Sequence, residues 1–227
     1  ELITTYFQRN SQLLATYKGN NSGTDLESEL RSHTDYDYSR TSTISDIAMP
    51  ATPGINKRYY YFNQSHSATY NQVFRVGKNG ELGINAAYLN DRDERSNQSV
   101  TTTLLPDGSK NVVDESFNGI LHRNIANGNI TYMQNTERNY IKEQLKFDWL
   151  STDGYSNIYA GEDIIQENNV ENYRLHNLFH LTSRTGSDKG VEFLSKINLE
   201  KKPHSLSVAP NLFPDVIMSE QMFQSAE

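Results

Sequence analysis

The chain contains no cysteine among its 227 residues, which excludes a disulfide framework and any metal site built on thiolates. A small secreted eukaryotic domain usually carries disulfides, so this absence favours a bacterial protein. Long apolar runs are missing too, and no stretch reaches the roughly 18 residues of a membrane-spanning helix. The chain starts at Glu1 rather than Met, without the basic head and apolar stretch of a signal peptide. We therefore expect a mature product or a piece of a larger protein.

Positive charge and apolar side chains are both scarce. The formal net charge is -7, which argues against a nucleic-acid-binding surface because such surfaces are basic. Hydrophobic residues make up 35% of the chain, a polarity that disordered chains share. Disordered chains are poor in aromatic residues, however, whereas this chain has 14 Tyr and 9 Phe. A β-barrel whose strands alternate apolar-outward and polar-inward has this composition.

Turn signals divide the chain into hairpins. A β-rich stretch, Tyr59–Val76, is followed by an Asn-Gly pair, the strongest short hairpin signal, and then by a second β-rich arm, Glu81–Asn90. Two further hairpins follow from the same pattern of β-rich arms around polar turns. The predicted turns are Lys78–Gly80, Thr136–Asn139 and Ser187–Lys189, and the arms of the second and third hairpins are Ser116–Asn135 with Tyr140–Leu150 and Val170–Thr185 with Val191–Lys201.

The arm Tyr140–Leu150 alternates with a period of two, as a strand with one apolar face does. We predict that its apolar face meets lipid and that its polar face lines a lumen. The two sets are Ile141, Leu145, Phe147 and Trp149 on the apolar face, and Lys142, Gln144, Lys146 and Asp148 on the polar face. The third hairpin divides in the same way, into Tyr173, Leu175, Phe179 and Leu181 against Arg174, His176 and His180.

Long polar stretches separate the hairpins. We predict that Asp91–Glu115, with its Pro106-Asp107-Gly108 turn, and Ser151–Asn169, with a strand-like centre, are long connectors. Successive connections alternate ends in an up-and-down sheet, so both should lie opposite the three short turns. Outer-membrane barrels show this asymmetry between short periplasmic turns and longer extracellular loops. The sequence thus predicts an all-β, antiparallel up-and-down meander that forms part of a large transmembrane β-barrel.

Two segments lack this pattern. Residues 34–56 are predicted as an irregular loop, and residues 203–227, which contain Pro203, Pro210 and Pro214, as an irregular tail. We expect the whole chain, 1–227, to be one barrel segment without a plug or closing strands.

The candidate ligand or interface residues are aromatic. The cluster Tyr59, Tyr60, Tyr61 and Phe62, together with Trp149, allows three interpretations: an aromatic girdle at a membrane interface, a stacking platform for a sugar ring, or ordinary strand residues. Side chains alternate along a strand, so the four clustered residues cannot all meet one ligand.

Other polar clusters favour no chemistry. His176 and His180 share a strand face, where we expect polar residues rather than metal ligands. The run Asp91–Arg95 lacks the glycine and the downstream Glu of a calcium loop, so we expect a solvated loop. The chain has no nucleophile elbow, phosphate loop or zinc-helix motif. We therefore expect no catalytic, cofactor-binding or metal-binding residues, and a protein that is not an enzyme.

Two strand segments, Phe62–Asn71 and Ala86–Asp91, form a recognisable pair. An Asn-x-Ser-His strand leads through a Gly/Asn hairpin into a strand that ends in Tyr-Leu-Asn-Asp, and a polar loop follows. This arrangement resembles the barrel region of TonB-dependent-receptor-like outer-membrane proteins, in the group that carries a carboxypeptidase-regulatory-like domain and a plug ahead of the barrel. The similarity extends from Leu13 to about Val208.

The resemblance implies a plugged barrel in the bacterial outer membrane that takes up a nutrient, driven by an inner-membrane energy-coupling complex. Its implied partners are outer-membrane lipid, the remaining barrel strands and plug of the parent protein, and a surface lipoprotein. The sequence shows no plug, energy-coupling box or closing strand, and its strands are too few for the barrels of such transporters, which have about 22. Active transport would therefore belong to the parent protein.

Two other non-catalytic functions remain open. The Tyr59–Phe62 cluster, Trp149 and the Asn-rich loops are compatible with a surface or periplasmic glycan-binding β module, and a purely structural β scaffold is the third possibility. Strand length separates the first two, because membrane-spanning strands need about 9–11 residues whereas sandwich strands average about 5–6. The predicted arms have the greater length.

Overall fold

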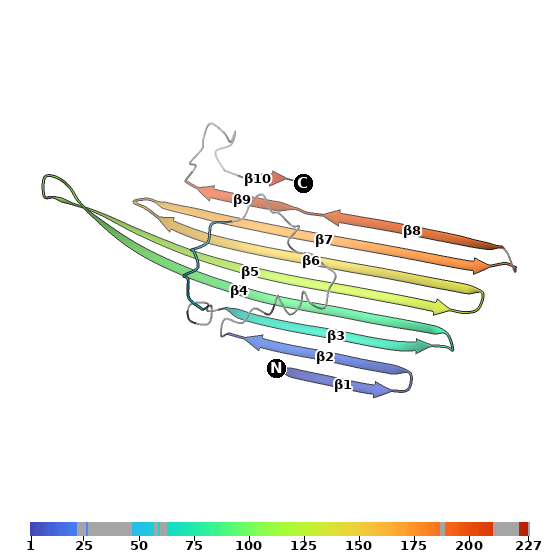
Figure 1. Cartoon of the computed structure of the whole chain (residues 1–227). Coiled ribbons are helices and arrows are strands. Elements are labelled where there is room, and N and C mark those ends of the chain that lie inside the picture. Colours follow the sequence, from blue (N-terminus) through green and yellow to red (C-terminus); the bar gives the residue numbers. More distant parts are fainter. Residues whose placement is uncertain are drawn as a thin grey trace.

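The structure, a computed structural model, describes residues 1–21, 26, 47–56, 59, 63–186, 189–210 and, by backbone path alone, 223–226. These residues form one antiparallel sheet, and the predicted all-β up-and-down fold is confirmed (Figure 1). Its strands are β1 (Leu2–Gln8), β2 (Ser11–Asn20), β3 (Gln64–Val76), β4 (Gly80–Leu104), β5 (Lys110–Asn135), β6 (Asn139–Tyr159), β7 (Asp163–Arg184), β8 (Gly190–Lys201), β9 (His204–Ala209) and β10 (Phe223–Ala226).

Consecutive strands of the chain are neighbours in the sheet from β1 to β7. β8 and β9 both pair with β7, end to end, and their registers continue one another: Tyr173 faces Lys201 and Val170 faces His204. Pro203 interrupts the strand because it has no backbone N–H, although its carbonyl still accepts the N–H of Glu171 at 2.9 Å. β8 and β9 are thus one long segment broken at a proline. The irregular tail predicted for residues 203–227 is wrong at His204–Ala209 and at Phe223–Ala226, which are strands.

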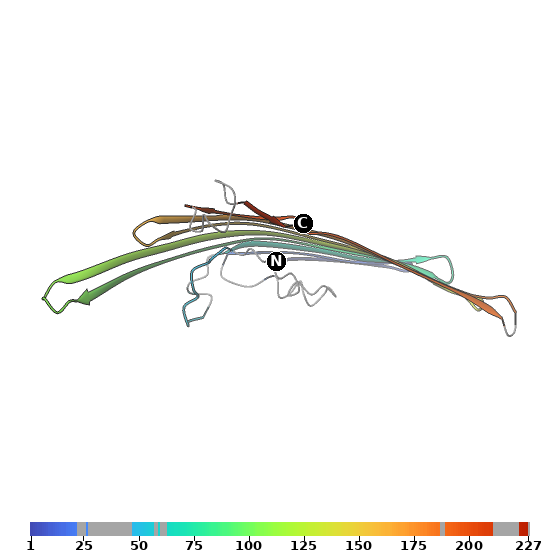
Figure 2. The same cartoon turned by 90° about the horizontal axis from the view of Figure 1, so that it is seen from above.

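Each strand presents alternate residues to two faces of the sheet. We call the face that carries Leu145 and Phe147 the apolar face, and the face that carries Lys146 and Asp148 the polar face. Residues that pair across strands share a face, so the register shows which residues of every strand lie on the apolar face and which on the polar face. Figure 2 shows that the sheet is curved and open, with segment 47–56 on its concave side. Since that segment contacts the polar face, as described below, the polar face is concave and the apolar face is convex.

The long connectors predicted between the hairpins are wrong. Asp91–Leu104 and Lys110–Glu115 extend β4 and β5 as a two-stranded ribbon, joined by a tight turn at residues 105–109 (Figure 1). Ser151–Asn169 likewise belongs to β6 and β7, with a turn at residues 160–162. Polar residues can form a strand as well as apolar ones do once neighbouring strands supply the backbone hydrogen bonds, and composition alone therefore suggested a loop.

The predicted hairpin turns are confirmed where the structure describes them. β3 and β4 are joined by residues 77–79, and β5 and β6 by residues 136–138, whereas Ser187 and Asp188 lie outside the described residues. The residue with positive φ in the first turn is Gly77, at 68°, rather than a member of the Asn-Gly pair. β3 begins at Gln64, so the strand predicted from Tyr59 starts later than expected.

The short turns are staggered along the sheet. One cross-strand row contains Tyr17, Ala68, Tyr88, Ala126, Trp149 and Tyr173. Counted from this row, the last paired residue before the turn is six residues away on β2 (Ser11), eight on β3 (Val76), nine on β5 (Asn135) and eleven on β7 (Arg184). The turns therefore advance by roughly one residue per strand.

Candidate functional site

The apolar face is open on the described part of the sheet. Leu145 is 37% exposed and Phe147 is 43% exposed, although both lie in the middle of β6. A sandwich would bury them between two sheets, and no second sheet covers them among the described residues. Polar residues also occur on this face, among them Gln72, Glu143 and Asn177, and Glu143 accepts a hydrogen bond from the amide of Asn177.

Aromatic residues border the apolar face. Tyr17, Tyr88, Trp149 and Tyr173 share the cross-strand row defined above. Toward the turns, a second set follows, made of Tyr6, Phe74, Tyr132, Phe179 and Phe193. The structure thus places the predicted residue Trp149 in an aromatic border.

The other predicted aromatics are separate from Trp149 in the fold. Tyr59 lies in the connector between β2 and β3, outside the strands, and is 67% exposed. Tyr60, Tyr61 and Phe62 lie outside the described residues. The expectation that the cluster starts a strand is wrong for Tyr59, because the sheet begins only at Gln64.

The polar face carries a hollow of about 670 Å³ along the middle of the sheet. Two adjacent cross-strand rows line it. The first row is Asn71, Asn85, Asn129, Lys146, His176 and Asn198, and the second is Thr69, Ala87, Asn127, Asp148, Arg174 and Glu200. Amide and charged groups from six strands therefore meet at one concave surface, which provides both donors and acceptors for a hydrated or polar solute.

The charged residues of this hollow are mostly paired. Nη2 of Arg174 lies 2.7 Å from Oε1 of Glu200, and the amide of Asn127 donates to Asp148 at 2.6 Å. The ring of His176 contacts the side-chain oxygen of Asn198. His180, further along β7, lies 2.8 Å from Oε1 of Glu192. No group of three metal-ligating side chains occurs among the described residues, so the structure brings no metal site together at these histidines.

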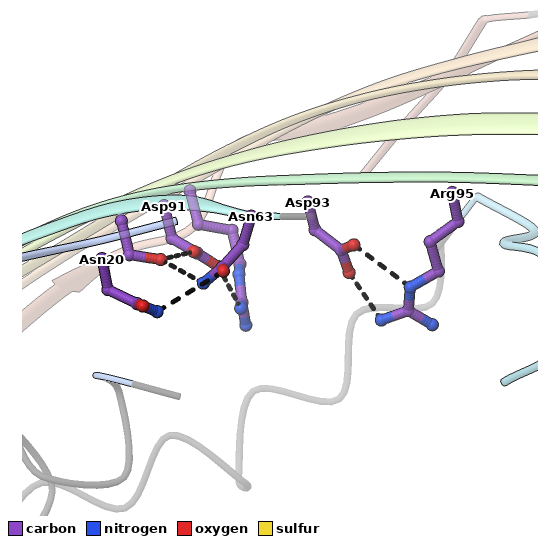
Figure 3. A network of polar contacts seen from close by, with 7 residues as sticks. Asn20, Asn63, Asp91, Asp93 and Arg95 are labelled. Carbon is purple, nitrogen blue, oxygen red and sulfur yellow. Dashed lines mark hydrogen bonds and ion pairs between the residues drawn. The ribbon is translucent and has the colours of Figure 1, made fainter. Parts of the chain in front are cut away.

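A polar network lies on the same face nearer the β2–β3 connector (Figure 3). Asn20 donates to Asn63 at 3.4 Å, Asn63 donates to Ser65 at 2.6 Å, and the Ser65 hydroxyl donates to Asp91. Nη2 of Arg123 lies 2.7 Å from Oδ2 of Asp91. The network ties the end of β2 and the start of β3 to β4 and β5.

The run Asp91–Arg95 is therefore not the solvated loop that we expected. It lies in β4, where Asp91 and Asp93 are 5% and 2% exposed. Arg95 holds Asp93 with two hydrogen bonds, at 2.5 and 3.2 Å. Buried carboxylates need such charged partners because desolvation otherwise disfavours the ionised form. The alternation of the run places Asp91, Asp93 and Arg95 on the polar face and Arg92 and Glu94 on the other.

The β2–β3 connector packs on the polar face. Leu26 joins a small apolar cluster with Leu89 and Ile125, and Ile47 is 7% exposed against Gly154. The N–H of Ala48 donates to Oε1 of Gln166 at 2.9 Å. Burying an aliphatic side chain such as Leu26 or Ile47 stabilises by about 1.5–3 kcal/mol, so these contacts hold the connector against the sheet.

The functional residues that the sequence did not predict are small or distant in the chain. The connector packs against Gly119 and Gly154, and Arg123 pairs with Asp91, which is 32 residues away in the sequence. A glycine inside a polar strand is a signal for close approach of another backbone, and Gly119 and Gly154 carry that signal. The partner at each glycine was not predictable, because it comes from a loop.

In the described part of the chain, no helix is long and apolar enough to cross a membrane. No family model matches this chain, and no curated protein matches it either. The geometry and the sequence resemblance therefore carry the functional proposal.

Proposed function

We propose that this chain is a wall segment of an outer-membrane β-barrel in an uptake receptor, and that it has no catalytic role. The observation that carries the proposal is the opposition of the two faces: the convex face is apolar, exposed and bordered by aromatic residues, and the concave face is polar. A transmembrane barrel needs this arrangement because lipid meets its outer surface and water its lumen.

The extent of the apolar face supports the proposal. On β7 it runs from Tyr173 to Leu181, nine residues and about 27 Å along a strand. Spanning strands need about 9–11 residues, and the apolar band of such barrels is about 25 Å tall. β3 to β7 have 13 to 26 residues, whereas sandwich strands have about 5–6.

The stagger of the short turns supports it independently. Periplasmic turns lie at one level along the barrel axis. If the short turns do so here, the strands must tilt against that axis by an angle that follows from the shift between neighbouring strands. A shift of nearly one residue, close to 3 Å, across a strand spacing of about 4.8 Å corresponds to a tilt of roughly 30°. Strands of outer-membrane barrels tilt by about 35–45°. The open sheet is concave on its polar face, the side that would line a lumen (Figure 2).

The sequence resemblance extends the proposal to a receptor. Phe62–Asn71 and Ala86–Asp91 resemble the barrel region of TonB-dependent-receptor-like proteins. A plug, the remaining strands and an inner-membrane energy-coupling complex would be partners of the parent protein, with a surface lipoprotein at its outer side. The polar hollow then lies on the lumen wall, along the path of the solute.

Spin labels can test which face meets lipid. The chain has no cysteine, so single variants at Phe147→Cys and the adjacent Lys146→Cys can each carry one nitroxide. The intact protein is inserted into phospholipid vesicles, and relaxation by oxygen is compared with relaxation by a water-soluble nickel chelate. We expect label 147 to respond mainly to oxygen, which concentrates in lipid, and label 146 to respond mainly to nickel. Equal, water-like responses at both positions would contradict the proposal.

A further inference from the structure

Side chains on a single-layer sheet remain partly exposed on both faces unless something covers them. Ser151 is buried on the apolar face, but most buried side chains of the described strands gather in one region of the polar face. They are Ser65, Ser67, Leu89, Asp91, Asp93, Ile125, Ser156, Asn168, Val170 and Asn172. Most residues of this set are polar. Their burial is therefore explained by a segment of the chain that lies over them rather than by a second apolar layer.

Residues 47–50, which we call the strap, supply part of this cover. The strap crosses the sheet where two strands carry glycine. A Cβ on Gly119 of β5 would lie 2.5 Å from Sδ of Met49 and 3.2 Å from Cδ of Pro50. A Cβ on Gly154 of β6 would lie 2.7 Å from Cδ1 of Ile47. Cβ atoms essentially never lie this close to a non-bonded atom. A larger residue at either position would force the facing strap side chain to shift, and at position 154 also the side chain of Asn168, whose Oδ1 would lie 2.2 Å away.

The strap lies between the connector end of the sheet and the polar hollow. Gly154 and Gly119 are five and seven residues from the aromatic row on the connector side, whereas Asn85 and Lys146, in the hollow, are three residues from it on the turn side. Leu26 contacts Leu89 and Ile125, one residue from that row, between the strap and the hollow. A solute that followed the wall of β5 to β7 from the connector end would therefore pass the strap before it reached the hollow.

We propose that the strap is a fixed constriction of the lumen, docked on β5 to β7 through Gly119 and Gly154, that limits the size of polar solutes reaching the hollow. This inference rests on the proposed function, because the polar face must line a lumen. The strap is held by backbone and side-chain contacts on three neighbouring strands, so it narrows the passage without having to move.

Docking can be tested by a disulfide. Met49→Cys and Gly119→Cys introduce one thiol on the strap and one on β5 into a chain without cysteine. Because Sδ of Met49 lies 2.5 Å from the Cβ position of residue 119, the two new side chains are within bonding reach. We expect the disulfide to form upon mild oxidation of the intact protein in its membrane. Failure to form it there would overturn the docked position of the strap.

The size limit for solutes that pass the strap can be measured by the reactivity of a thiol placed in the hollow. Asn85→Cys is treated, in intact cells, with maleimides attached to polymers of graded length. With the strap docked, we expect short reagents to react and long ones to react slowly. Gly119→Val should raise the rate of the long reagents severalfold. Gly128→Val is the matched control on β5, where a Cβ would meet nothing within 4 Å, and should leave the size limit unchanged.

Two further variants separate the alternatives. Ile47→Ser weakens docking without changing a strand, so it should also relax the size limit, even if Gly119→Val disturbs folding. In the oxidised Met49→Cys/Gly119→Cys protein, the thiol introduced by Asn85→Cys should keep the original size profile. A slower reaction of short reagents there would show that the strap normally moves, and would overturn a fixed constriction.

The failure of this inference is distinguishable from failure of the proposed function. An unchanged size limit in both Gly119→Val and Ile47→Ser, together with lipid exposure of label 147, would overturn the proposed constriction but not the proposed function. Water-like exposure of label 147 would remove both.

Discussion

Asp91 on β4 and Arg123 on β5 are register partners on the polar face, and Nη2 of Arg123 lies 2.7 Å from Oδ2 of Asp91. The carboxylate also accepts the Ser65 hydroxyl from β3, so one side chain joins three strands. Next to it in sequence, Arg92 and Glu94 form a pair at 3.1 Å on the other face, with side chains 41% and 57% exposed. The first pair is buried and joins two strands, whereas the second is exposed and lies along one strand, so together they compare a buried with an exposed ion pair in the same part of the sheet.

We predict that Asp91→Ala lowers the free energy of unfolding by about 3 kcal/mol, because it removes the buried acceptor that Arg123 and Ser65 share. Glu94→Ala should cost less than about 1 kcal/mol, because exposed pairs are screened by water. Urea unfolding of the intact protein in vesicles measures both. Equal losses in the two variants would show that burial does not distinguish the pairs.

An arginine on the apolar face should destabilise the membrane-inserted protein. Leu145→Arg places a charge where we propose lipid, at a cost of about 2–4 kcal/mol near the bilayer midplane. Gln144→Arg, on the adjacent polar-face position, should change the free energy of unfolding little. The measurement is unfolding in phospholipid vesicles, and a larger loss for Gln144→Arg than for Leu145→Arg would invert the assignment of the faces.

The turn between β3 and β4 depends on the positive φ of Gly77, which is 68°. A Cβ at this position would meet nothing within 4 Å, so Gly77→Ala tests backbone strain without a steric clash. We expect a loss of about 1–2 kcal/mol in unfolding free energy, since L-residues are strained in this region. Gly186→Ala, in the next-but-one short turn and without a positive φ, is the control and should be close to neutral. A neutral Gly77→Ala would mean that the turn can adopt another conformation.

Asp107 should titrate below its ordinary range. The hydroxyl and N–H of Ser109 both donate to its carboxylate, at 2.6 and 2.9 Å, and they lower its pKa, the hydroxyl most. Because the folded-state pKa lies below the unfolded one, the ionised carboxylate stabilises the turn fully above the ordinary Asp pKa. This contribution is lost as the pH falls through the lowered value.

Nuclear magnetic resonance titration of the Asp107 carboxyl carbon measures this pKa directly. Ser109→Ala removes the hydroxyl donor, so the pKa of Asp107 should rise toward its ordinary value of 3.8. An unchanged pKa in Ser109→Ala would contradict the cause assigned here.

The sequence by itself determined the hairpins around the short turns and the two faces of their arms. The period-two pattern in Tyr140–Leu150 placed Leu145 and Phe147 opposite Lys146 and Asp148, because successive side chains of a strand must point to opposite sides. Turn residues located the hairpins for a similarly local reason, since Gly and Asn adopt backbone conformations that other residues avoid. Local physics was therefore sufficient for the all-β meander.

Only the tertiary structure decided how polar stretches and distant residues meet. Asp91–Arg95 has the composition of a loop, yet it is a strand that pairs with β5, and Arg123 and Arg95 pair with its buried carboxylates. The position of the strap on Gly119 and Gly154 depends on contacts about 70 and 107 residues away in the chain. Such contacts follow from the register of whole strands and from the path of a connector, and no local preference encodes either.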